Sequence, residues 1–137
     1  MGILRSLPLF ALIWVLYNVV AVAGSAETLQ HSLVGFTLIS GAHWTINVGE
    51  LLIIIGLIVL FIEVFKSTRT STASVLNHIL STLMFIVFLV QFLTVADAGT
   101  SVFFILMVMS LMDVIAGFSV TIFTARRDFA VGEQVNL

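Results

Sequence analysis

Seven polar side chains that could carry chemistry lie within or at the edges of long apolar stretches of the sequence: Asn18, Asn47, Glu50, Glu63, His78, Gln91 and Asp113. Carboxylates and imidazoles exchange protons, and all seven side chains can hydrogen-bond between helices. Each is costly to place in hydrocarbon. We therefore expect them to face another helix, a partner or a cavity rather than lipid.

Asp113 stands near the middle of the last apolar stretch and is the strongest candidate for a role beyond packing. A carboxylate at that depth must be paired or protonated. Ser110 and Gly117 share its helical face at spacings of three and four residues, and small residues allow helices to approach closely. We expect Asp113, Ser110 and Gly117 to contact another helix or a partner subunit, in a role that is either structural or proton-transferring.

Two further pairs follow from residue numbering. In an antiparallel pair of helices, residues at one level have numbers with a constant sum. The residue numbers of Glu50 and Gln91 have the same sum as those of Glu63 and His78. If the second and third spans are neighbours, one register between them would therefore place the two residues of each pair at the same depth in the membrane. For Glu63 and His78 two interpretations stay open: a carboxylate that reaches the membrane surface, or a pair that exchanges protons.

Glu50 and Asn47 lie three residues apart, on one face of an expected helix. With Gln91 at a similar level, they predict hydrogen bonds between helices or to a partner. A contact with a ligand or an ion is the alternative interpretation.

Several classes of chemistry are not expected. The chain has no Cys, and we find no phosphate-binding Gly-rich loop, no His-Glu-x-x-His pair and no Gly-x-Ser-x-Gly motif. Five basic residues and a net charge of −2 give no field for nucleic acid. His31 and His43 are expected at the membrane interface rather than as metal ligands. We predict no catalytic residues and no metal site, and the sequence names no cofactor.

The composition decides the class of protein that must position these residues. Hydrophobic residues make up 61% of the 137-residue chain and charged residues 9%, against about 25% charged in a soluble domain. Mean hydropathy is +1.26. So few charges cannot cover a water-soluble surface. The chain is therefore expected to be an integral membrane protein.

Four stretches are long enough to cross a bilayer, since a spanning helix needs about 20 apolar residues. We expect an all-α, antiparallel four-helix bundle formed by one domain over 1–137, with spans at about 3–23, 44–65, 74–96 and 100–125. Leu29, Leu33, Phe36 and Leu38 lie in the connection between the first two spans. They favour a short interfacial helix there, with an ordered loop as the alternative.

The basic residues set the expected orientation, because cytoplasmic loops are enriched in Lys and Arg. With four spans, all of them fall on one side of the membrane, and Glu27 and Asp97 fall on the other; the basic residues are Arg5, Lys66, Arg69, Arg126 and Arg127. Both termini are therefore expected in the cytoplasm. A bacterial inner membrane is the favoured location.

Three functions fit these observations. We favour a non-enzymatic accessory subunit of a larger membrane complex, with lipids and other integral membrane subunits as partners. A small ion- or proton-coupled transporter or channel, formed as a homo-oligomer, is the main alternative, because the carboxylates lie at several depths. An intramembrane enzyme or a subunit that binds a quinone or pigment is the third.

Overall fold

The computed structural model describes residues 6–68 and 72–135, and 79% of the structure is helical. Helix α2 (Phe10–Tyr17) continues into a π-helical segment (Asn18–Gly24) and a 3₁₀ helix (Ala26–Gln30). Strands β1 (Ser32–Thr37) and β2 (His43–Asn47) follow. Then come α3 (Val48–Ser67), α4 (Thr72–Thr94), a 3₁₀ turn (Ala96–Ala98) and α5 (Ser101–Val135).

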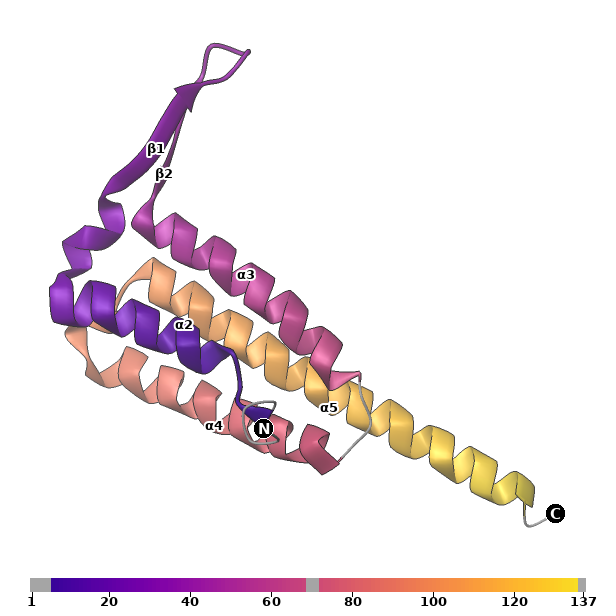
Figure 1. The fold of residues 1–137 in the computed structure, drawn as a ribbon. Coiled ribbons are helices and arrows are strands. Elements are labelled where there is room, and N and C mark those ends of the chain that lie inside the picture. The colour runs from indigo at the N-terminus through magenta and orange to yellow at the C-terminus, as the bar shows by residue number, and fades with distance from the viewer. Residues whose placement is uncertain (1–5, 69–71, 136–137) are drawn as a thin grey trace.

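The four helices run antiparallel in sequence order, with α5 between α3 and α4 (Figure 1). Helix α5 makes its most extensive contacts with α3 and α4, whereas α2 packs on α3 and α4 from the other side. Consecutive helices α3 and α4 thus face each other diagonally and make few contacts. The expectation that the second and third spans form a neighbouring pair is wrong. Helix α5 occupies the groove between them, because the short turn at 95–100 folds it directly back on α4.

Among the described residues, three helices are long and apolar enough to cross a membrane: Val48–Ser67, Val75–Thr94 and Ser101–Gly132. The apolar helix over Phe10–Gly24 is shorter. The first expected span, 3–23, lies partly outside the described residues. Ser6 is helical, but the helix is interrupted over Leu7–Leu9 and α2 begins at Phe10, because Pro8 donates no hydrogen bond and disfavours helical backbone at the residue before it.

Most of the connection before α3 is a β-hairpin, so the interfacial helix expected over Leu33, Phe36 and Leu38 is wrong, and the chain is mostly helical rather than all-α. Leu29 lies before the hairpin, in the short 3₁₀ helix. Strand residues Val34 and Phe36 pair with Ile46 and Trp44, and this alternation with small and polar residues has the period of a strand. Gly41 adopts a φ of 84° at the tip, a conformation that favours glycine. The hairpin projects from the end of the bundle (Figure 1).

The boundary between β2 and α3 is set by Asn47, which caps α3. The second span therefore begins at Val48 rather than near residue 44. Helix α5 in turn extends to Val135, beyond the expected end near 125. At about 1.5 Å per residue it is far longer than the roughly 30 Å hydrocarbon core. Its last turns project beyond the other helices, at the end opposite the hairpin (Figure 1).

Aromatic rings fill the middle of the bundle. Phe88 of α4 lies against Phe10 of α2 and Phe103 of α5, with ring centroids 6.5 and 5.3 Å apart. Tyr17 is fully buried against Phe103 at 4.7 Å. Its hydroxyl donates to the Asp97 carbonyl at 2.8 Å and is 2.7 Å from Thr100 Oγ1. These contacts fasten the end of α2 to the turn between α4 and α5.

Candidate functional site

Buried polar residues gather near the end of the bundle where α3 ends and α4 begins. Glu63 and Lys66 belong to α3, Asn77, His78 and Ser81 to α4, and Asp113 to α5; we call these six residues the carboxylate cluster. The exposed fractions of Glu63, Ser81 and Asp113 are 0%, 3% and 4%. Such burial of ionisable and polar groups makes this cluster the candidate site.

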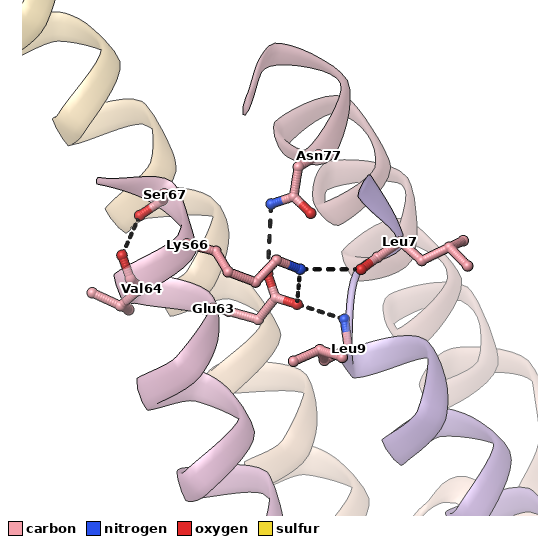
Figure 2. Close-up of polar contacts among 7 residues, drawn as sticks. All are labelled: Leu7, Leu9, Glu63, Val64, Lys66, Ser67 and Asn77. Atoms are coloured by element: carbon pink, nitrogen blue, oxygen red, sulfur yellow. Dashed lines mark hydrogen bonds and ion pairs between the residues drawn. The ribbon is translucent and has the colours of Figure 1, made fainter. Parts of the chain in front are cut away.

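Glu63 joins three helices of the bundle (Figure 2). Its Oε1 accepts from the backbone N–H of Leu9 at 2.5 Å and from Lys66 Nζ at 3.2 Å. Its Oε2 accepts from the Asn77 amide at 3.5 Å. The carboxylate thus holds the start of α2 and the first turns of α4 against α3. Leu9 has no side-chain cap of its own, so Glu63 supplies from another helix an acceptor for a backbone donor.

Lys66 adds a further contact to this junction of α2, α3 and α4, which we call the clamp and which is formed by Glu63 and Lys66 with Leu7, Leu9 and Asn77. It forms an i,i+3 ion pair with Glu63, and its ammonium also donates to the Leu7 carbonyl at 3.2 Å. One ammonium therefore binds α3 to the segment before α2 (Figure 2). One interpretation of the sequence is that the Glu63 carboxylate reaches the membrane surface. The ion pair is present, but the carboxylate itself is fully buried.

Next to the clamp lies a small polar cavity. It is lined by Ser67, Asn77, His78, Ser81, Asp113, Gly117 and Thr121. The space open to the centre of a water molecule is about 10 Å³, near the lower limit for one water. Three buried atoms on its lining helix α4, Asn77 Oδ1, His78 Nε2 and Ser81 Oγ, have no hydrogen-bond partner within the described residues.

Asp113 faces this cavity from α5 rather than lipid. It lies within electrostatic range of Glu63 and Lys66, and Ser81 is its neighbour on α4. Gly117, one turn further along α5, lies directly against the His78 ring, so that a Cβ at this position would overlap the imidazole. His78 also packs edge-on against Phe118 at 4.0 Å. Because Gly117 has no side chain, the His78 ring fits against α5 and borders the same cavity as Asp113.

The chain matches no protein-family model, no curated protein and no solved structure. Within residues 6–68 and 72–135, no group of three His, Cys, Asp or Glu side chains is placed to hold a metal ion. The Asp113 carboxyl group and the His78 imidazole line the cavity, and the Glu63 carboxylate and the Lys66 ammonium lie beside it. This arrangement can exchange protons or form a polar contact between helices.

A second polar group lies between α2 and α4. Trp14 Nε1 donates to Gln91 Oε1 at 2.5 Å, and the Gln91 amide donates to Asn18 Oδ1 at 2.6 Å. The Asn18 amide donates to the Trp14 carbonyl at 2.8 Å. Gln91 thus pairs with Asn18 and Trp14 rather than with Glu50. These three residues border an open, largely apolar groove of about 500 Å³.

Asn47 and Glu50 form a capping box at the start of α3. The Glu50 N–H donates to Asn47 Oδ1 at 2.8 Å, and the Asn47 N–H donates to Glu50 Oε2 at 2.9 Å. These bonds satisfy backbone donors that a helix N-terminus leaves free. Both side chains thus serve their own helix. An Asn three residues before a Glu, followed by an apolar run, was the signal that could have found this cap.

Of the other predicted residues, Ser110 is buried at 1% exposure on the same face of α5 as Asp113. Glu63 reaches Asn77, the neighbour of His78, so the proton-exchanging pair is not formed by direct contact in the structure. Sequence reasoning missed one anchoring residue, Tyr17. Tyr17 is the sole tyrosine and lies in an apolar stretch, where its hydroxyl needs a partner, and that was the available signal.

Proposed function

We propose that the protein is a non-enzymatic accessory subunit that spans the membrane four times and binds a partner protein through its hairpin. The observation that carries this proposal is the apolar face of the hairpin. Val34, Phe36, Trp44 and Ile46 form two cross-strand pairs on this face. The rings of Phe36 and Trp44 pack at a tilt, with their centroids 5.1 Å apart, yet the two residues remain 52% and 43% exposed. No other described element of this chain covers them.

Beyond the register irregularity between Ser32 and Val34, where Leu33 is also exposed, the opposite face of the hairpin carries small and polar residues. Gly35 pairs with Thr45, and Thr37 pairs with His43, whose ring nitrogen lies 3.3 Å from the Thr37 hydroxyl. The hairpin is therefore amphipathic. Ile39 extends the apolar surface at the tip, where it is fully exposed. An isolated two-stranded hairpin is only marginally stable in water, so a surface that packs on the apolar face would stabilise it.

A protein is the occupant that suits this face better than lipid. A two-stranded sheet has two open edges with free N–H and C=O groups, which cannot be placed in hydrocarbon. The hairpin therefore belongs outside the hydrocarbon core. There, a partner can cover the apolar face and can also hydrogen-bond to an open edge. An apolar face beside open polar edges therefore favours, as the partner that covers the hairpin, an extramembrane region of another subunit.

The charge distribution supports an outward-facing hairpin. Lys66 is near the end of α3, and Arg126 and Arg127 lie in the projecting part of α5, at the opposite end from the hairpin (Figure 1). Positive residues favour the cytoplasmic side. We therefore infer cytoplasmic termini, with the short α2 helix as part of a fourth span, and an inner membrane of a bacterium as the location.

Site-specific photo-crosslinking in the native membrane tests this function. A photoreactive residue at Phe36 should give a discrete adduct with a protein, and the same residue at Thr45, on the polar face, serves as the matched control. The double variant Phe36→Ser/Trp44→Ser should lose the crosslinked partner while the helices still insert. Adducts with lipid alone at Phe36, or equal protein adducts at both positions, would contradict the proposal.

A further inference from the structure

The carboxylate cluster contains more negative than positive charge. The ionisable groups that face Asp113 are Glu63 and Lys66 from α3 and His78 from α4. Lys66 is bound to Glu63 and to the Leu7 carbonyl. Its charge therefore compensates Glu63, and Asp113 has no ion-pair partner among the described residues. An uncompensated carboxylate within a membrane-spanning helix is costly. The cluster needs one further positive charge.

The cavity beside Asp113 is built for a small polar ligand. Asn77 and Ser81 are 8% and 3% exposed, and their unpartnered oxygen atoms border the space together with the unpartnered His78 Nε2. A buried water typically makes two to four hydrogen bonds and needs a volume of roughly 10–15 Å³. The cavity, at about 10 Å³, offers both the partners and the space for one water.

We propose that this cavity is a proton-binding site, in which Asp113 takes up one proton and a single water links its carboxyl group to His78, Asn77 and Ser81. On uptake, a proton leaves bulk water and forms an O–H bond with a carboxylate oxygen of Asp113. On release, that bond breaks and the proton returns to water. Uptake neutralises the excess charge without moving Lys66 from Glu63.

The lining favours a proton over a metal cation. Hard cations prefer a shell made of oxygen ligands, whereas one of the three unpartnered atoms here is an imidazole nitrogen. A water can donate to Asn77 Oδ1, can donate to or accept from Ser81 Oγ, and can bond to His78 Nε2 in either ring tautomer. Ser67, the last residue of α3, also lines the cavity. It marks the end of the bundle from which protons would enter. This inference is independent of docking through the hairpin.

Carbon-13 NMR of the full-length protein in lipid vesicles, labelled at the aspartate carboxyl carbons, tests the site. The chain has only Asp97, Asp113 and Asp128, and Asp97 and Asp128 are exposed. We expect one carboxyl signal to titrate apart from the other two. Asp113→Asn should abolish that signal, whereas the matched variant Asp97→Asn should leave it in place.

Two variants keep Asp113 and probe the water. Ser81→Ala and His78→Gln should each shift the midpoint of the separate titration by up to about one pH unit, a tenfold change in proton affinity, which corresponds to one buried hydrogen bond. Three aspartates that titrate together, or midpoints unchanged in both variants, would overturn the proposal. A midpoint that moves when sodium replaces choline at constant ionic strength would assign the cavity to sodium and overturn it as well.

Discussion

Replacing Glu63 with alanine removes an acceptor shared by α2, α3 and α4. The fully buried carboxylate accepts from the Leu9 N–H, from Lys66 and from Asn77. Removing one partner of a buried ion pair costs about 3–5 kcal/mol when the other charge is stranded. Lys66 is 28% exposed and keeps its bond to the Leu7 carbonyl, so its charge is not stranded. The expected loss is therefore that of the three hydrogen bonds to the carboxylate, at about 1 kcal/mol each, so the free energy of unfolding should fall by about 3 kcal/mol.

Glu63→Gln separates the hydrogen bonds from the charge. The amide carbonyl can still accept from Leu9, so the expected loss is smaller, about 1–2 kcal/mol. Glu27→Ala is the matched control, because Glu27 is exposed in the 3₁₀ helix, and it should change stability by less than about 0.5 kcal/mol. The free energy of unfolding of the purified protein in mixed micelles, followed by tryptophan fluorescence, measures all three.

The order of the three variants is the decisive result. A loss for Glu63→Ala no larger than that for Glu27→Ala would refute the clamp altogether. Equal losses for Glu63→Ala and Glu63→Gln would place the whole effect in the charge and refute the role assigned to the Leu9 N–H.

Three further predictions concern packing, the amide group and orientation. Gly117→Ala should destabilise the protein by about 1–3 kcal/mol, because a Cβ there overlaps the His78 ring. The control is Gly132→Ala, on the same helix but in open space. It should leave stability unchanged or raise it by up to about 1 kcal/mol. Gln91→Leu should cost about 1 kcal/mol and change the fluorescence of Trp14, which loses its acceptor; an unchanged spectrum would contradict this. A cysteine near either terminus should resist an impermeant label applied from outside, and labelling at one terminus alone would indicate an odd number of spans.

The membrane class and three spanning helices could be predicted from the sequence, because hydropathy over about 20 residues depends on composition alone. The hairpin could not be predicted in the same way. Leu33, Phe36 and Leu38 fit an interfacial helix by composition, but Gly35 and Gly41 disfavour one, and the pairing of Phe36 with Trp44 depends on a contact between two segments. Local patterns could indicate each strand but not the sheet.

The residues of the candidate site could be predicted from their types, but the contacts between them could not. Asp113, Glu63 and His78 stand out in the sequence as polar residues in apolar stretches. Which of them meet depends on the order of helices around the bundle, and α5 lies between α3 and α4. This order brings Asp113 to His78 and Glu63 to Asn77. Residue numbering along one assumed pair of helices cannot contain that information.

The clamp and the cavity are connected through Lys66. Its ammonium is held between Glu63 and the Leu7 carbonyl, which ties α2 to α3 and leaves Asp113 without an ion pair among the described residues. The ion pair of Lys66 with Glu63, which helps to hold the helices together, thus leaves the negative charge of Asp113 uncompensated beside the cavity. Glu63→Gln should release part of this hold on Lys66 and also remove one negative charge near Asp113. The separate Asp113 titration should therefore move to a different pH in Glu63→Gln, but not in Glu27→Gln, and an unmoved midpoint would show that the two features act independently.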